Sequence, residues 1–308
     1  MLDRRELLAT AAVLLASPPS AFADSQGGDA ALNRLFDQFM KENLDNSPTT
    51  VTSLGLDTGA RAYQKSQIDD ASLVGIAKDK AITANQFSRL QAFDRNSLTP
   101  KGKVSYDVIL YGLASNADAN KRFAYGPGGA GQPYILSQLT GCYNQGPSFL
   151  DTQHIIATKA DADAYLARLA AFAVTMDQEI EAARHDVALG VVPPDFALAK
   201  TILQMKDLRA PAPEKSTLVE SLVRRTKEKN IAGDWSGQAA KILKEKYYPA
   251  LERQIALVTE MRKQAVHDAG VWRLPDGAAY YRASLRSWAT TDKSPEEIHK
   301  LGLEVVAD

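Results

Sequence analysis

The chain has 308 residues, of which 45% are hydrophobic and 24% are charged, and its formal net charge at pH 7 is -1. These values are typical of a soluble globular protein that is long enough to bury a sizeable core. A charge so close to zero provides no electrostatic attraction to polyanions. The composition therefore argues against a nucleic-acid partner and against binding to an anionic membrane surface.

Residues 1–23 have the pattern of an export signal peptide. Arg4 and Arg5 precede a short apolar run, and a small-x-small cleavage pattern ends at Ala23. A helix that spans a membrane needs about twenty apolar residues, so we expect no stable membrane insertion after cleavage. The sequence predicts a periplasmic or secreted mature protein, residues 24–308. The paired arginines make the twin-arginine route one option for its export.

Helical periodicity runs through most of this mature chain. Apolar residues three and four positions apart predict successive helices that begin near Asp29, Ser47, Asp70, Thr99, Thr158, Asp195, Ser216 and Ser236. Residues 56–68 are predicted to form a loop, and Pro249 predicts a kink or break in the helix that begins near Ser236. Signals for β-strands are nearly absent. We therefore predict an all-α fold, a multi-helix array of long and short helices with few or no strands.

An irregular crossover is predicted at about 124–157, because this stretch fits neither a helix period nor a flexible linker. Its central part, Pro133 to Ile156, concentrates side chains that can do chemistry: Tyr134, Gln138, Cys142, Tyr143, Asn144, Gln145, Asp151 and His154. Two interpretations stay open. The crossover is either a functional loop on a rigid scaffold or a buried connection that satisfies its own backbone groups.

Several familiar signatures are incomplete in this sequence. Residues 126–131 match the pattern G-x-G-x-x-G, but the strand and the helix that a phosphate-binding loop requires do not flank them. Cys142 is the single cysteine, which excludes an internal disulfide and a C-x-x-C site. A lone cysteine of this kind is usually a small packed hydrophobic residue.

The four histidines are too widely separated to form an H-E-x-x-H zinc motif. The pairs Glu181 with His185 and Glu296 with His299 share helix faces, which ordinary surface pairing explains. Only one Glu-x-x-His segment is present, so a di-iron bundle is not expected. We predict no metal ligand in this chain. A Ser-His-Asp set assembled from distant residues stays an open third possibility for a hydrolase.

The last 35 residues predict two helices. The first follows a turn at Pro275 and carries Tyr280 and Tyr281, and the second begins with a capping box between Ser294 and Glu297. The second helix has a strong start and no glycine stop. This pattern predicts that the sequence is truncated at residue 308 and is the N-terminal portion of a larger protein.

Three blocks occur in one order: PYILSQLTGCYNQGPSFLDTQH, VVPPDFALAKTILQM and LPDGAAYYRASLRSWATTDKSPEEIHKLGLEVV. Together they resemble the bacterial family called domain of unknown function 885, and the resemblance extends over the mature chain. Members of that family are exported, mainly helical and about twice this length. They resemble zinc metallopeptidases, since their C-terminal half carries a His-Glu pair followed by Pro-Gly-His. That motif is missing here.

The resemblance implies a helical N-terminal part of an exported peptidase-like protein. This part would form cleft walls and contact a peptide substrate, while a missing C-terminal half would bind zinc and carry out hydrolysis. It implies supporting catalytic roles for Tyr280, Tyr281 and His299. It implies cleft or substrate-binding roles for Tyr134, Gln138, Asp151, His154, Thr290 and Thr291. No cofactor is expected on this chain alone. The alternative is a non-catalytic periplasmic binding or scaffold protein.

Overall fold

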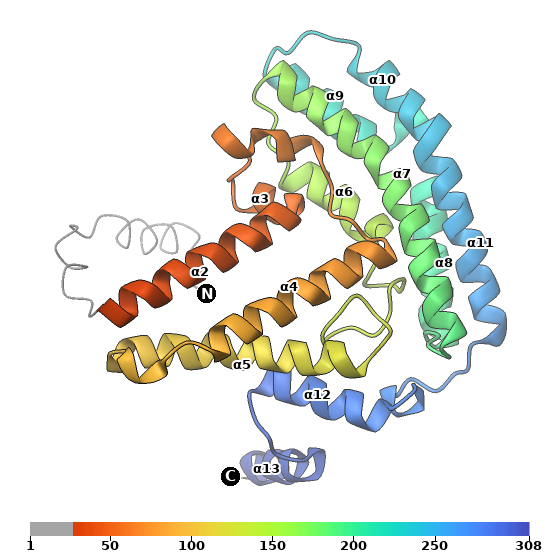
Figure 1. The fold of residues 1–308 in the computed structure, drawn as a ribbon. Helices are drawn as coiled ribbons and strands as arrows, with labels where there is room; N and C mark the ends of the chain where they lie inside the picture. The colour runs from red at the N-terminus through yellow and green to blue at the C-terminus, as the bar shows by residue number, and fades with distance from the viewer. Residues whose placement is uncertain (1–26, 308) are drawn as a thin grey trace.

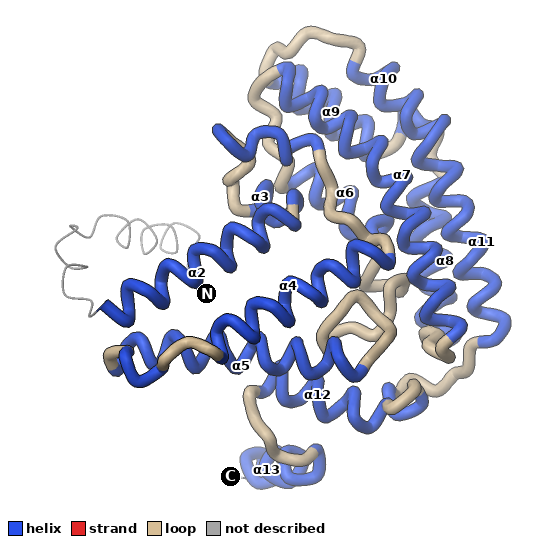
Figure 2. Tube along the Cα trace, viewed as in Figure 1, coloured by secondary structure: helices blue, strands red, loops and turns tan. Residues whose placement is uncertain are grey.

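The computed structural model describes residues 27–307, and within this range the chain forms twelve α-helices, α2 to α13, and no strand. Figure 2 shows these helices joined by loops and short turns. The predicted all-α fold is confirmed. The predicted export signal lies outside the described residues. None of the described helices is both long enough and apolar enough to cross a membrane.

The first group of helices comprises α2 (Gly27–Asn46), α4 (Leu73–Gln91) and α5 (Pro100–Arg122), which pack on one another (Figure 1). Their shared core consists of buried aromatic and aliphatic side chains, Leu32, Phe39, Leu90, Leu98 and Tyr106. As predicted, Thr99 caps α5, and its hydroxyl accepts a hydrogen bond from the backbone N–H of Gly102 at 3.1 Å.

Asp29 does not have its predicted role as an N-cap, because α2 already begins at Gly27. Its carboxylate instead accepts hydrogen bonds from the backbone N–H and the hydroxyl of Thr99, at 2.9 and 2.5 Å. The hydroxyl of Thr99 thus serves α2 and α5 together. This contact fixes the start of α2 against the start of α5.

The second group is built around α7 (Lys159–Ala188), a helix of 30 residues that packs against α11 (Tyr248–Gln264) (Figure 1). The predicted start at Thr158 is confirmed, because Thr158 and Asp161 form a reciprocal capping box. After α7 the chain reverses at Gly190, whose φ of +83° is a conformation that glycine adopts at low cost.

Three further helices complete the second group: α8 (Asp195–Arg209), α9 (Thr217–Glu228) and α10 (Trp235–Ile242). Helix α10 runs into α11 through one π-helical turn, Leu243–Tyr247. Pro249 has no N–H to donate to the carbonyl oxygen four residues earlier, which favours a wider turn at this place. The disturbance predicted near Pro249 therefore takes the form of a π turn.

The predicted crossover at about 124–157 is only partly irregular, because α6 (Cys142–Thr152) occupies its middle. Gly146 and Pro147 lie inside α6, and Gly141 is its N-cap residue. These residues lower the intrinsic helix propensity, which is why the sequence pattern missed this helix. Packing of α6 against α7 and α9 outweighs that weak propensity. Similarly, the predicted loop 56–68 contains a 3-10 helix, Gly59–Ser66.

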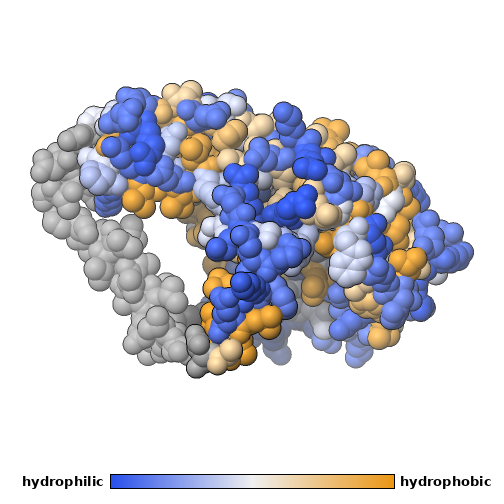
Figure 3. Space-filling view, turned by 90° about the horizontal axis from the view of Figure 1, so that it is seen from below, coloured by the Kyte–Doolittle hydropathy of each residue, from blue (hydrophilic) through white to orange (hydrophobic). Residues whose placement is uncertain are grey.

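Two short helices follow, α12 (Gly277–Ala289) and α13 (Pro295–Ala307). The predicted capping box at α13 is confirmed, since Ser294 and Glu297 exchange hydrogen bonds of 2.7 and 3.1 Å. No residue of α13 is buried against the rest of the described chain. Figure 1 shows α13 standing apart from the body beside α12. Figure 3 views the molecule from this side and shows hydrophobic side chains interspersed with hydrophilic ones.

Candidate functional site: a cavity between α3, α4, α6 and α7

A cavity of about 570 Å³ lies where the two groups of helices meet. Its walls come from α3 (Pro48–Ser53), residues 68–79, the irregular residues 127–141, the start of α6 and the middle of α7. This volume is in the range of pockets that hold small ligands. The cavity joins segments that are distant in the sequence.

The lining of the cavity combines apolar side chains with carboxylates. The main apolar residues are Leu54, Ile68, Ile76, Ile135, Phe149 and Phe172, and the acidic residues are Asp69, Asp70, Asp79 and Glu179. The described lining contains no lysine, arginine or histidine. None of the four carboxylates forms an ion pair with a described basic side chain. The cavity is therefore negatively charged wherever these groups are ionised.

Glu179 is the most deeply buried of the four acidic residues, with 7% of its surface exposed. One carboxylate oxygen accepts a hydrogen bond from the backbone N–H of Cys142, and the other accepts one from the side-chain amide of Gln254, both at 2.7 Å. Burial raises the pKa of Glu179 to about 6. Since Cys142 begins α6, Glu179 also places a carboxylate where the helix dipole favours one.

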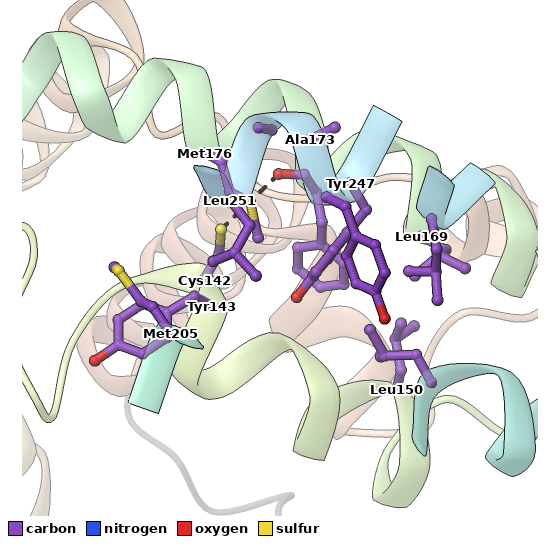
Figure 4. Close-up of a cluster of buried hydrophobic side chains, with 14 of the residues drawn as sticks. Cys142, Tyr143, Leu150, Leu169, Ala173, Met176, Met205, Tyr247 and Leu251 are labelled. Atoms are coloured by element: carbon purple, nitrogen blue, oxygen red, sulfur yellow. Dashed lines mark hydrogen bonds between the residues drawn. The ribbon is translucent and has the colours of Figure 1, made fainter. Parts of the chain in front are cut away.

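Cys142 lies beside Glu179, is 9% exposed and packs into the largest hydrophobic core (Figure 4). Burial raises the pKa of its thiol well above the usual value, and the neighbouring Glu179 adds to the rise. The thiolate is the reactive form of cysteine, so this environment works against a nucleophilic role. A buried, packed cysteine is what the sequence predicts.

The other three carboxylates lie near the junction of α3 and α4. Asp69 accepts hydrogen bonds at 2.9 Å from the backbone N–H of Thr49 and from the hydroxyl of Ser47, and it thereby holds the start of α3. Asp79 accepts a hydrogen bond from the side-chain amide of Asn46. Burial and then repulsion from Asp69 raise the pKa of Asp79. Burial is the larger cause of this rise, and the neighbouring carboxylate is the second.

Of the residues predicted to line a cleft, Tyr134 alone is part of the described wall of this cavity. Its hydroxyl accepts a hydrogen bond from the guanidinium group of Arg273 at 3.1 Å. The backbone carbonyl of Gln138 accepts one from Asn144 at 3.2 Å, while its side-chain oxygen is buried without a partner in the described chain. Gln138 does not line the cavity.

Asp151 and His154 lie elsewhere, although the sequence grouped them with Tyr134. Asp151 accepts hydrogen bonds from Ser221 at 2.5 Å and from Arg224 at 3.2 Å, in a surface hollow between α6 and α9. His154 is 0% exposed, so it cannot line a cleft formed by the described residues. These two residues thus lie in separate settings within the described chain, and their predicted roles stay predictions.

The residues of the C-terminal block are also dispersed. Tyr280 is 2% exposed, and its hydroxyl has no partner in the described chain. Tyr281 is half-exposed on α12, Thr290 and Thr291 lie in the turn after α12, and His299 is exposed on α13. None of them lines the cavity. Their predicted supporting and substrate-binding roles stay predictions.

The sequence analysis missed the acidic residues of the cavity. Glu179 lies on an apolar stripe of α7, three residues after Met176 and four before Ala183, and Phe172 belongs to the same stripe. A carboxylate on such a face must be hydrogen-bonded or adjoin a polar cavity, so this signal could have identified Glu179. No comparable pattern marks Asp69 or Asp79.

The zinc ion that the family resemblance implies does not fit the residues of this structure. In residues 27–307 no group of three or more His, Cys, Asp or Glu side chains could hold a metal ion. The carboxylates around the cavity thus do not converge as a metal site would require.

The fold and the cavity together define an all-α protein with a ligand-sized, acidic cavity. The family described as "Bacterial protein of unknown function (DUF885)" matches residues 48–308. The chain therefore belongs to this family, as the three sequence blocks predicted.

One solved structure shares the fold over most of the chain. It is described as the "putative lipoprotein from Colwellia psychrerythraea", and it has a TM-score of 0.80 and 19% sequence identity to this chain. The match covers 92% of this chain but 49% of the other, so this chain spans about half the length of the solved protein. No curated protein matches the chain.

Proposed function

We propose that this chain is the helical N-terminal part of an exported, zinc-peptidase-like protein and that its cavity contacts a peptide substrate. Hydrolysis and any zinc are assigned to residues beyond those in this sequence. The family match supports the membership from which the peptidase-like character is inferred, and the lipoprotein description of the solved neighbour supports export. Tyr280, Tyr281 and His299 keep their supporting roles within it.

The observation that carries the proposal is the cavity at the junction of the two helix groups. Its apolar wall, which includes Ile76, Phe149 and Phe172, suits the side chains of a peptide. Its carboxylates and the Tyr134 hydroxyl offer hydrogen-bond acceptors for peptide N–H groups. A cavity with both properties can hold an extended segment and fix its orientation.

The test is to narrow the cavity mouth without disturbing the core. Ser53 lines the cavity and is exposed, so Ser53→Trp adds bulk at the mouth. We expect this variant to bind a defined set of unmodified tetrapeptides at least tenfold more weakly than the parent protein by calorimetry. Ser53→Ala controls for loss of the hydroxyl, and Ser88→Trp adds the same bulk to an exposed site of α4 away from the cavity.

Unchanged peptide affinity in Ser53→Trp would contradict a substrate role for the cavity. The same peptides can be incubated with the full-length gene product, and their cleavage can be followed. Binding that depends on Ser53 but is not followed by cleavage would favour the alternative, a non-catalytic periplasmic binding protein.

A further inference from the structure

We propose that the cavity selects ligands that carry a positive charge, specifically a primary ammonium group such as a peptide N-terminus or a lysine side chain. This inference rests on the proposed function and names the class of substrate. Its basis is a cavity of about 570 Å³ in which every charged group of the described lining is a carboxylate.

The carboxylates lie at two places along the cavity. Glu179 comes from the middle of α7 and stands beside the start of α6, whereas Asp70 and Asp79 belong to the segment around the start of α4. Apolar side chains such as Phe149 and Phe172 also form part of the wall. An amine on an aliphatic stem matches this combination, because its stem packs on the apolar wall while its ammonium group approaches a carboxylate.

Basic residues near the cavity offset its charge only in part: Lys78 interacts electrostatically with Asp79 and Arg168 with Asp69, but neither basic residue lines the cavity. Lys80 follows Asp79 in the sequence, but its ammonium group faces the carbonyl oxygen of Phe123 at 3.4 Å and it does not line the cavity. Arg273 approaches the cavity only through the hydroxyl of Tyr134. The negative charge of the wall is thus available to a ligand.

Ligands of other charge fit less well. An anion would meet four carboxylates and no lysine or arginine of the described lining. A bare metal ion would lack a converging set of three ligands in the described chain. A neutral peptide would gain the apolar contacts but would bring no positive charge to the carboxylates.

Cys142 provides a reporter inside this cavity, because it lines the wall and is the single cysteine of the chain. Two methanethiosulfonate reagents of similar size, one with a trimethylammonium group and one with a sulfonate group, convert the thiol to a mixed disulfide and release methanesulfinate. The intrinsic reactivity of the thiol affects both rates equally and cancels in their ratio. The ratio therefore reports the local electrostatic potential.

We expect the ratio of the cationic rate to the anionic rate to be at least tenfold higher at Cys142 than at free cysteine in the same buffer. The double substitution Asp70→Asn and Asp79→Asn should lower this preference towards that of free cysteine. Asp163→Asn is the matched control, because Asp163 is on α7 but pairs with Lys159 on the outer surface. A ratio in the parent protein equal to or below that of free cysteine would overturn the proposal.

A second measurement decides the matter if neither reagent reaches Cys142. Tetra-alanine with a free N-terminus and its N-acetylated counterpart differ in the ammonium group alone, and calorimetry compares their affinities. We expect the free amine to bind at least tenfold more tightly. Equal binding of both peptides, weakened alike by Ser53→Trp, would overturn the charge selection and leave the proposed function standing. Binding of neither peptide would count against both.

Discussion

Arg168 donates a hydrogen bond from Nη1 to Nδ1 of His154 at 2.9 Å, and both side chains are 0% exposed. Because a guanidinium group can only donate, Nδ1 of His154 is unprotonated. The proton of the neutral ring is then on Nε2, which donates to the backbone carbonyl of Asp161 at 2.8 Å. The structure therefore fixes the tautomer of this buried histidine.

The remaining donors of Arg168 join α7 to two other segments. They bind the carbonyl oxygens of Gln67 and Gln64 at 2.9 and 3.1 Å, and the hydroxyl of Thr52 at 2.6 Å. Helix α7 is thus connected to α3 and to the chain after it. These segments form one side of the cavity, so the His154 environment acts on the cavity by holding its wall.

The first prediction concerns this buried arginine. Arg168→Met should lower the free energy of unfolding by about 3–5 kcal/mol, because it leaves several buried acceptors without a donor. Arg184→Met, at an exposed position of the same helix, should change it by less than about 0.5 kcal/mol. Denaturation in guanidinium chloride measures both. Similar stability of the two variants would show that the buried hydrogen bonds contribute little.

The second prediction is a pH dependence of stability from His154. Burial, with the nearby positive charge of Arg168 as a further cause, lowers its pKa to about 4 from 6.5. Between about pH 6.5 and 4, the unfolded chain therefore binds a proton at this histidine, whereas the folded protein does not. The free energy of unfolding is therefore highest above pH 6.5, and it decreases by on the order of 3 kcal/mol as the pH falls to about 4. His154→Gln should remove this part of the dependence.

Glu179 gives the third prediction, and its sign is opposite. Its pKa is raised to about 6 from 4.5, so the folded protein holds this proton more tightly than the unfolded chain. The resulting stabilisation is complete below pH 4.5 and is lost as the pH rises through 6. Glu179→Gln should therefore gain stability relative to the parent as the pH rises from 4.5 to 7, by about 1–2 kcal/mol. A constant difference across this range would contradict the buried, ionisable carboxyl.

The fourth prediction compares two helix caps. Thr158→Ala should cost about 1 kcal/mol of global stability, because Thr158 caps a helix that forms part of the main core. Ser294→Ala removes a similar cap from α13, which buries no residue against the described chain. That substitution should change hydrogen exchange within α13 and leave the global unfolding midpoint unchanged. Equal midpoint shifts would show that α13 is coupled to the core.

Local signals account for the parts of the fold that the sequence predicted. The caps at Thr99, Thr158 and Ser294 depend on residues within one helical turn, so they are visible in the sequence. Helix α6 was missed because Pro147 and two glycines lower its propensity, while contacts with distant helices decide its structure.

The cavity was missed for a related reason. Its wall joins residues around Asp69, the start of α6 and Glu179, and no spacing rule connects segments so far apart. The residues grouped by sequence proximity, such as Tyr134 and His154, belong instead to different environments. His154 shows the difficulty well, because its burial follows from Arg168 on another helix.

The π turn at Leu243–Tyr247 sets the rotational phase of α11. A π turn holds one residue more than an α turn, so it rotates the residues that follow by about 100° around the helix axis relative to a regular α-helix of the same sequence. With this rotation, α11 directs Gln254 to Glu179, while the adjacent Arg253 forms an exposed ion pair with Asp177. If the same residues continued as a regular α-helix instead, these two positions would move around the axis. The proline that follows the turn thus helps to determine whether an amide or a guanidinium group meets the buried carboxyl of the cavity.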